Sequence, residues 1–206
     1  MEGQPMGEGF DRLAARRGID GQVYEPAEDS WLLATVVLEE ITAEDLVIDV
    51  GTGSGFVARR IADAVGATVI GTDINPHACR QAADAGVPTI RTAVLSAIAD
   101  DVADVVVCNP PYLPAEPSVD RDDWLSVAVV GGQTGRAVVD RLLADFDRVL
   151  GENGRGYVLV SSHMDIEAVC TTALEHGFVA REIARDDSFP DEVLVVLRIE
   201  RRAGDR

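Results

Sequence analysis

The chain has 206 residues, of which 47% are hydrophobic, and this length and composition suit one globular domain. Acidic residues outnumber basic ones by 36 to 18, and the net charge of −18 argues against free duplex nucleic acid as the main target. Every basic residue is arginine. Molar salt would screen such a charge, so we expect a halophilic host, although a genome rich in G and C would also favour arginine.

The sequence predicts a cytoplasmic protein. No apolar run reaches the ~18 residues that a membrane-spanning helix needs, and the polar, glycine-rich N-terminus has no signal-peptide core. Three cysteines, at positions 79, 108 and 170, lack metal-like spacing and are expected to be reduced. We expect no metal site in this chain.

In chain order, apolar periodicity predicts alternating helices and strands. Residues 1–22 show little periodicity and are expected to form a flexible or weakly helical lead, ahead of one domain over residues 23–206. Helices are predicted over residues 28–40, 56–65, 76–85, 136–150 and 165–176. Strands are predicted over residues 46–50, 67–73, 87–95, 104–108, 157–161, 178–183 and 192–200. The alternation indicates a mostly parallel sheet, and the last two strands suggest a pair with one antiparallel member.

A glycine-rich turn joins the strand at 46–50 to the helix at 56–65. Its spacing over residues 51–55 is G-x-G-x-G, and glycines at such a turn let backbone amides approach a ligand closely. The next strand ends in Asp73, about twenty residues downstream, where a carboxylate can bind both hydroxyls of a ribose. Either feature occurs in doubly wound domains without this ligand, but the pair together favours a nucleoside-containing ligand.

The sequence Asn-Pro-Pro-Tyr (residues 109–112) directly follows the strand at 104–108. Proline fixes φ and cannot donate to a β-ladder, so the chain must leave the sheet there. The Asn109 side-chain oxygen and the Pro110 carbonyl can accept the two hydrogens of a planar –NH2 group, and Tyr112 can cover its face. The loop at 113–124, with two more prolines and several acids, is expected to form the substrate-facing lip.

Taken together, these features resemble the class I S-adenosylmethionine-dependent methyltransferases that modify a nitrogen conjugated to a π-system. Three further segments narrow the resemblance to the HemK-type release-factor glutamine methyltransferases, in their short archaeal and eukaryotic branch. They are Val-Tyr-Glu-Pro-Ala-Glu-Asp-Ser at 23–30, Asp-Ile-Asn-Pro at 73–76 and Gly-Gly-x-x-Gly-Arg at 131–136. The resemblance covers nearly the whole chain from about residue 23.

The resemblance implies one Rossmann-like α/β domain with a seven-stranded, mostly parallel sheet, one antiparallel strand and helices on both faces. It implies S-adenosyl-L-methionine as the cofactor and N5-methylation of the glutamine in the Gly-Gly-Gln loop of a class I translation release factor. Relatives in the short branch are heterodimers with a small zinc-binding methyltransferase activator. We therefore expect such a partner to cover the edge strand at 87–95, and we expect no membrane and no direct nucleic-acid contact.

Carried over position by position, the resemblance assigns roles to residues of this chain. The expected cofactor-binding residues are Tyr24, Pro26, Ala27, Ser30, Asp49, Gly51, Gly53, Gly55, Asp73, Ile74, Ala93, Val94 and Asn109. The expected substrate-binding residues are Asn109, Pro110, Pro111 and Tyr112, of which Asn109, Pro110 and Tyr112 are the expected catalytic ones. Relatives often carry an acid after the third strand that binds the adenine amine, and none stands at residues 92–95 here. Backbone and apolar contacts, or else Asp100 or Asp101, are expected to bind adenine instead.

Alternative functions share the same motif. Asn-Pro-Pro-Tyr does not distinguish a glutamine amide from the exocyclic amine of adenine or guanine in RNA or DNA. Methylation of protein lysine fits less well, because an ammonium must first lose a proton and no base is evident. A non-catalytic scaffold that binds S-adenosylmethionine is a further alternative. The chain's own Gly-Gly-Gln at 131–133 is interpreted as a loop and helix start, not as a target of automethylation.

Overall fold

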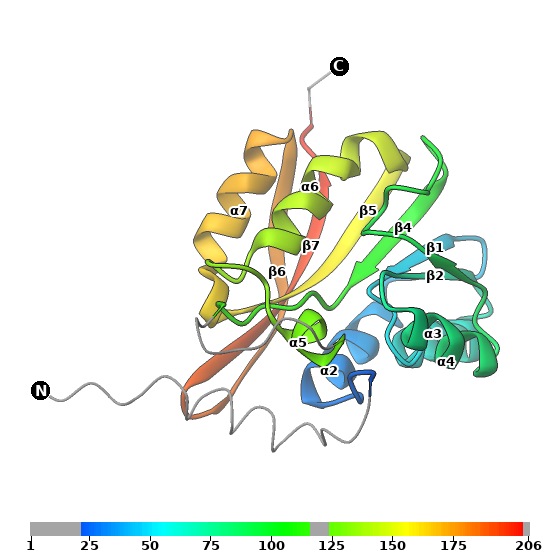
Figure 1. The fold of residues 1–206 in the computed structure, drawn as a ribbon. Helices are drawn as coiled ribbons and strands as arrows, with labels where there is room; N and C mark the ends of the chain where they lie inside the picture. The colour runs from blue at the N-terminus through cyan, green and yellow to red at the C-terminus, as the bar shows by residue number, and fades with distance from the viewer. Residues whose placement is uncertain (1–21, 116–123, 204–206) are drawn as a thin grey trace, which may run out of the picture.

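The computed structural model describes residues 22–115 and 124–203. Seven strands form one sheet in the order β3-β2-β1-β4-β5-β7-β6 (Figure 1). They are β1 Leu46–Val50, β2 Thr68–Asp73, β3 Thr89–Arg91, β4 Ala103–Cys108, β5 Leu150–Ser161, β6 Phe178–Phe189 and β7 Glu192–Arg201. Only β7 runs antiparallel to its neighbours, β5 and β6. The sheet predicted from the sequence, mostly parallel with one antiparallel strand, is confirmed.

Helices cover both faces of the sheet (Figure 1). They are α2 Glu28–Val37, α3 Phe56–Val65, α4 Pro76–Asp84, α5 Trp124–Val129, α6 Ala137–Val149 and α7 Ile166–Glu175, with a short 3₁₀ turn at Ser162–Met164. The helices α6 and α7 lie along β5, β7 and β6 on one face, and α2 packs against α3 on the other. In the part of the chain that the structure describes, no helix is both long and apolar enough to cross a membrane.

The core lies around the central strands β1 and β4. All residues of β4 are buried except Asp104, whose carboxylate accepts the Leu46 backbone N–H at 2.8 Å and so ties the starts of the two strands together. On β5, Gly156 lets α6 approach closely, because a Cβ there would come within 2.5 Å of the Phe146 ring. Continuous apolar runs with both faces covered are typical of strands in a parallel sheet, which explains why these strands were predictable.

Several predicted elements differ in extent. The strand predicted over 87–95 is only Thr89–Arg91, and the helix predicted over 28–40 ends at Val37. The strand predicted to begin at residue 157 begins at Leu150, because pairing with β4 carries it through the glycines that sequence reasoning assigned to a loop. The short helix α5 was not predicted. The lead expected at 1–22, apart from Gln22, and residues 116–123 of the expected lip lie outside the described residues.

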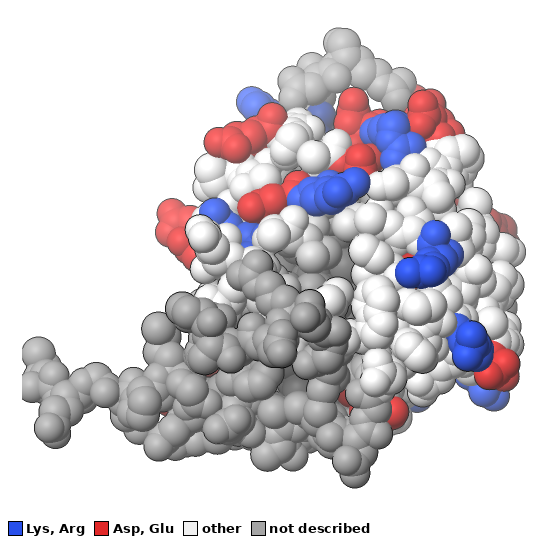
Figure 2. Space-filling model, viewed as in Figure 1, with Lys and Arg blue, Asp and Glu red and all other residues white. Residues whose placement is uncertain are grey.

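Arginine side chains anchor the segment after α2 to the sheet. The Arg155 guanidinium donates to both oxygens of Asp45, at 3.3 and 3.0 Å, and to the Glu40 carbonyl at 2.8 Å. Arg198 on β7 and the Tyr157 hydroxyl both donate to the Glu40 carboxylate. Such forked geometry suits guanidinium better than ammonium. On the face drawn in Figure 2, arginine and acidic side chains likewise lie against one another.

Candidate active site

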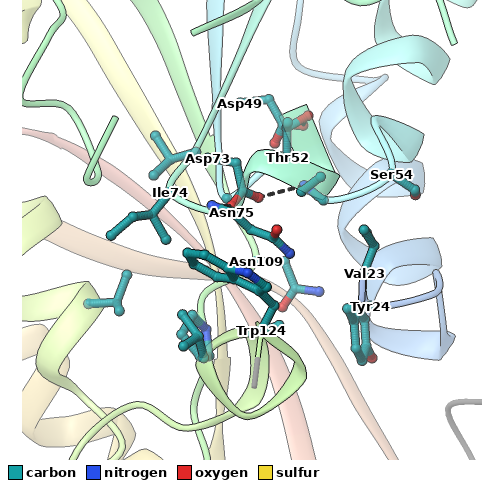
Figure 3. Close-up of a pocket in the computed structure, with 18 of the residues that line it drawn as sticks. Val23, Tyr24, Asp49, Thr52, Ser54, Asp73, Ile74, Asn75, Asn109 and Trp124 are labelled. Carbon is teal, nitrogen blue, oxygen red and sulfur yellow. Dashed lines mark hydrogen bonds between the residues drawn. The ribbon is translucent and has the colours of Figure 1, made fainter. Parts of the chain in front are cut away.

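A cavity of about 410 Å³ opens at the carboxyl ends of β1, β2 and β4 (Figure 3). The strand order reverses between β1 and β4, and such a switch point is where open α/β sheets bind ligands. The volume lies within the usual range for small-molecule and cofactor sites. The predicted site residues that line it are Tyr24, Pro26, Ser30, Asp49, Gly51, Gly53, Asp73, Ile74, Ala93, Val94, Asn109 and Pro111.

The glycine turn after β1 is attached to β2 by backbone hydrogen bonds. The N–H groups of Gly51 and Thr52 both donate to the Thr72 carbonyl, at 2.8 and 2.9 Å. Gly53 has φ +55, a left-handed conformation that favours glycine, and its N–H donates to an Asp73 carboxylate oxygen at 3.0 Å. The turn is therefore fixed by main-chain geometry, and it presents main chain to the cavity.

Asp49, at the floor of the cavity, is 3% exposed and accepts the Thr52 hydroxyl at 2.7 Å. Burial raises the pKa of its carboxyl to about 6, against the opposing hydrogen bond from Thr52. A cation bound beside Asp49 would favour the ionised form. The residue is thus suited to hold a ligand ammonium group under the glycine turn.

Asp73, at the end of β2, faces the cavity beside the turn (Figure 3). One carboxylate oxygen accepts the Gly53 N–H and the other accepts the Asn75 N–H at 2.8 Å. Burial raises the pKa of Asp73, while these backbone donors act in the opposite direction. Each oxygen holds more than one lone pair, so the oriented carboxylate can still accept from the two hydroxyls of a ribose.

The Asn109 side chain, which follows β4, is oriented by a hydrogen bond to α2. Its side-chain N–H donates to the Ser30 hydroxyl oxygen at 3.3 Å, and the Ser30 hydroxyl in turn donates to Asp29 at 3.2 Å. Because the serine proton is directed to Asp29, the serine oxygen must accept from Asn109. This leaves the Asn109 Oδ1 as an acceptor, and Asn109 lines the cavity with Asp73 and the glycine turn.

Asp29 is the centre of this hydrogen-bond network, and sequence reasoning gave it no role. The side chain is 2% exposed and accepts the Ser30 backbone N–H at 2.6 Å, the Tyr24 hydroxyl at 2.9 Å and the Tyr112 hydroxyl at 3.5 Å. A buried carboxylate with several donors is strongly held. Its place in the first turn of α2, next to Ser30, was the available signal, but the acid suggested only a favourable helix dipole.

Four predicted site residues do not line the cavity. Tyr112 is 2% exposed and is directed to Asp29, so it does not cover the face of a bound amide as expected. Pro110 is buried, and Ala27 precedes α2 without reaching the cavity. Gly55 serves packing instead, because a Cβ there would lie 3.1–3.2 Å from Ala82 and Val87.

The two acids proposed from the sequence for adenine also lie elsewhere. Asp100 forms a surface ion pair with Arg148 at 2.9 Å, and Asp101 lies in the turn before β4, facing a separate polar hollow. Neither lines the cavity, whereas Thr92, Ala93 and Val94 do. The other expectation, that backbone and apolar contacts hold the adenine, is the one compatible with these positions.

Residues after the Asn-Pro-Pro-Tyr loop complete the wall, and sequence reasoning missed them. A parallel bridge joins Leu113 to Val130, through Leu113 N–H to the Val129 carbonyl at 2.9 Å and Gly131 N–H to the Leu113 carbonyl at 2.8 Å. This bridge brings α5 to the cavity. The lining residues that were not predicted are Val23, Val50, Thr52, Ser54, Phe56, Val57, Asn75, Ala78, Thr92, Trp124, Ser126, Val127, Ala128, Val130, Gly132 and Val138.

The glycines of the 131–136 segment support the Asn-Pro-Pro-Tyr loop from behind. A Cβ on Gly131 would lie 2.4 Å from the Pro111 carbonyl oxygen, and one on Gly135 would lie 2.4 Å from the Tyr112 carbonyl oxygen. Main chain therefore packs directly on main chain at both places. The Gly-Gly-x-x-Gly pattern was the signal that could have predicted this contact.

Comparison with known proteins agrees with this geometry. Residues 47–125 match the methyltransferase domain family. The chain is 31% identical to a protein of Methanocaldococcus jannaschii whose name places it provisionally among the protein N5-glutamine methyltransferases. The alignment covers 85% of this chain and 90% of that protein. It is 30% identical to the methyltransferase HEMK2 of Mus musculus, over 78% of this chain and 82% of HEMK2. The chain belongs to the HemK-type methyltransferases, in the branch that includes HEMK2.

A solved structure supports the same placement. The E. cuniculi Mtq2–Trm112 complex, described as responsible for methylation of the eRF1 translation termination factor, superposes with a TM-score of 0.73. That chain is 29% identical, and the alignment covers 88% of this chain and all of that one. Membership of this family makes the protein an S-adenosylmethionine-dependent methyltransferase. The resemblance to HemK-type enzymes stated from the sequence is confirmed.

The cavity fits S-adenosylmethionine by its own chemistry. Asp73 can bind the ribose, Asp49 and the glycine turn can hold the amino acid moiety, and Asn109 lines the same cavity. The cofactor supplies an electrophilic methyl carbon on a sulfonium. Among the described residues there is no group of three or more His, Cys, Asp or Glu side chains that could hold a metal ion.

Proposed function

We propose that this enzyme methylates the N5 atom of the glutamine in the Gly-Gly-Gln loop of a class I translation release factor. The observation that carries the proposal is the orientation of Asn109, whose side-chain oxygen is left free as an acceptor by the hydrogen bond to Ser30. The names of the M. jannaschii relative and of the E. cuniculi complex support glutamine and a release factor as the target class.

The geometry suits an amide nitrogen, which is a weak nucleophile because its lone pair is delocalised into the carbonyl. The Asn109 Oδ1 accepts one hydrogen of the substrate –NH2 group. The family resemblance assigns the second hydrogen to the Pro110 main-chain carbonyl. Pro110 itself is buried and is not among the residues that line the cavity. Two acceptors orient the nitrogen and stabilise the positive charge that develops on it in the transition state.

No residue needs to act as a strong base in this scheme. Of the described carboxylates that line the cavity, Asp49 accepts from Thr52, and Asp73 accepts from the backbone of Gly53 and Asn75. Correct placement of reacting groups can supply roughly 7–11 kcal/mol of barrier reduction. The proton can then leave late, to water, from an already methylated and more acidic nitrogen.

We propose that a small zinc-binding activator protein pairs with the β3 edge of the sheet, as the named partner Trm112 suggests for the E. cuniculi enzyme. The edge strand β3 is only three residues long, and the Ile90 side chain on it is 36% exposed. An unpaired edge with exposed apolar side chains favours association. The zinc would belong to the partner.

We further propose that the enzyme works in the cytoplasm of a halophilic archaeon. The support is compositional: 36 acidic residues against 18 arginines. Screening of this repulsion should raise the melting temperature between 0.1 and 2 M KCl. A melting temperature that falls over this range would contradict the proposal of a halophilic host.

The function is tested by methyl-transfer mass spectrometry on the release factor of the host, with and without the activator protein. The expected result is a gain of one methyl group on the Gly-Gly-Gln glutamine. Total RNA, DNA and a release factor with that glutamine changed to asparagine are parallel substrates. Methylation of nucleic acid or of lysine, with the glutamine left unmodified, would replace the proposal by one of the alternatives.

A further inference from the structure

The end of the cavity beyond Asp73 contains no carboxylate among the described residues. The two acids that line the cavity, Asp49 and Asp73, both lie next to the glycine turn. Beyond them the wall consists of Ile74, which is 47% exposed, and of Ala93 and Val94. Among the described residues, an adenine ring at this end would therefore meet mainly apolar side chains.

Three aromatic side chains line the cavity, and two of them are engaged elsewhere. The Tyr24 hydroxyl donates to Asp29, and the Phe56 ring packs edge-on against Trp31 with 4.8 Å between centroids. Trp124 on α5 is half-buried and has no hydrogen bond or ring contact with any described residue. Figure 3 shows its indole turned into the cavity, in the region between Ile74 and Asn109.

We propose that Trp124 is the stacking surface for the adenine ring of S-adenosylmethionine. The indole and Ile74, which both line this end of the cavity, would contact the two faces of the ring. Indole is flat, polarisable and apolar, so it stacks on a purine without needing a hydrogen bond. The inference concerns cofactor binding alone and is independent of which substrate is methylated.

The first test uses the fact that the chain has two tryptophans, Trp31 and Trp124. In Trp31→Phe the emission reports Trp124 alone, and Trp31 lies on the outer face of α2 with 49% of its surface exposed. S-adenosylhomocysteine and 5′-methylthioadenosine, which both contain adenine, should quench this emission with saturation. Homocysteine, which lacks adenine, should not. Absence of quenching by saturating S-adenosylhomocysteine would overturn the proposal.

The second test measures affinity by calorimetry on the full chain. Loss of base stacking weakens binding by about 1–3 kcal/mol, so Trp124→Leu should raise the Kd for S-adenosylhomocysteine roughly ten- to hundredfold. Trp124→Phe keeps a ring and should stay within about threefold of the parent chain. An unchanged Kd in a folded Trp124→Leu protein would refute the assignment. If that variant does not fold, the fluorescence of Trp31→Phe decides.

Discussion

The glycine turn and the Asn-Pro-Pro-Tyr loop hold the same cavity from two sides, but they are stabilised differently. The turn at 51–55 is fixed by its neighbour β2, through backbone bonds to the Thr72 carbonyl and one bond from Gly53 N–H to the Asp73 carboxylate. The loop at 109–112 is fixed by side chains of α2, Ser30 and Asp29, and by packing against the glycines at 131 and 135.

The difference shows where each half of the site is sensitive. A turn made of main chain tolerates changes in the side chains around it, because hydrogen bonds between backbone groups persist. A loop positioned by a network of side chains depends on each member of that network. Substitutions of residues in this network should therefore impair methyl transfer more than cofactor binding, even where they lie far from the reacting nitrogen.

The largest effect is expected for Asn109→Ala. The variant loses the acceptor that orients the substrate nitrogen, so kcat should fall roughly 10²–10³-fold, whereas the Kd for S-adenosylhomocysteine should change little. Steady-state kinetics and calorimetry measure the two quantities. Asn153→Ala, an exposed asparagine on β5, is the matched control. Parallel losses in turnover and cofactor affinity would show that Asn109 serves the cofactor instead.

The second-largest loss of activity is expected for Gly131→Ala, which tests the packing of the glycine segment against the Asn-Pro-Pro-Tyr loop. The new methyl would lie 2.1 Å from the Gly135 carbonyl oxygen and 2.4 Å from that of Pro111, so both the turn at 131–135 and the loop must shift. A displacement near 1 Å can cost about 10²-fold in rate. Gly151→Ala, whose Cβ would have its nearest neighbour at 3.7 Å, should be nearly silent in the same assay. Equal activity of the two variants would remove the supporting role of Gly131.

A smaller loss is expected for Asp29→Asn, which replaces one acceptor oxygen by a donor amide that faces other donors. The mismatch should cost about 1–3 kcal/mol of folding free energy, visible as a lower melting temperature. It should also reduce kcat/KM about tenfold through misorientation of Ser30 and Asn109. Glu28→Gln, one residue earlier and exposed, is the control. If activity survives unchanged, Asn109 does not need this network.

The smallest effect concerns pH on the side of the glycine turn. Since the pKa of Asp49 is raised to about 6, its neutral form stabilises the empty protein at low pH, and this contribution is lost as pH rises through 6. A bound ammonium group favours the ionised form instead. As pH increases from 5 to 6, affinity for S-adenosylhomocysteine should therefore rise about fivefold, and it should level off above pH 7. Asp49→Asn should show a flat profile, and a flat profile in the parent chain would contradict the role of Asp49.

Most of the fold could be predicted from local patterns. Buried strands such as Leu46–Val50 and the helix start at Asn75-Pro76 carry their own signals, and Asn75 indeed caps α4 by accepting the His77 N–H. The predictions that were wrong concern strands whose extent is set by tertiary contacts. The β5 strand includes glycines because β4 pairs with it, and β3 is short because only three residues align with the end of β2.

The site residues also divide into those that local sequence patterns predict and those that tertiary contacts place. Gly51, Gly53, Asp73 and Asn109 line the cavity as predicted from the sequence, because they stand at the carboxyl ends of β1, β2 and β4, whereas Gly55 does not. Tyr112 was assigned to the cavity because it neighbours Asn109 in sequence, yet its ring is buried and directed to Asp29. Trp124 was included only as the last residue of the expected substrate-facing lip. Its place on the cavity wall depends on the bridge between Leu113 and Val130, which no local pattern predicts.

That bridge has a consequence for how such enzymes diversify. The chain leaves the Asn-Pro-Pro-Tyr loop at Leu113 and returns at Val130, and backbone hydrogen bonds join the two points. The cost of closing a flexible loop grows only slowly with its length, so insertions or deletions between the clamped ends should leave the Asn109 geometry intact. Because Trp124 and other lining residues of α5 also lie between these ends, such changes would alter the cavity wall while they preserve the Asn109 geometry.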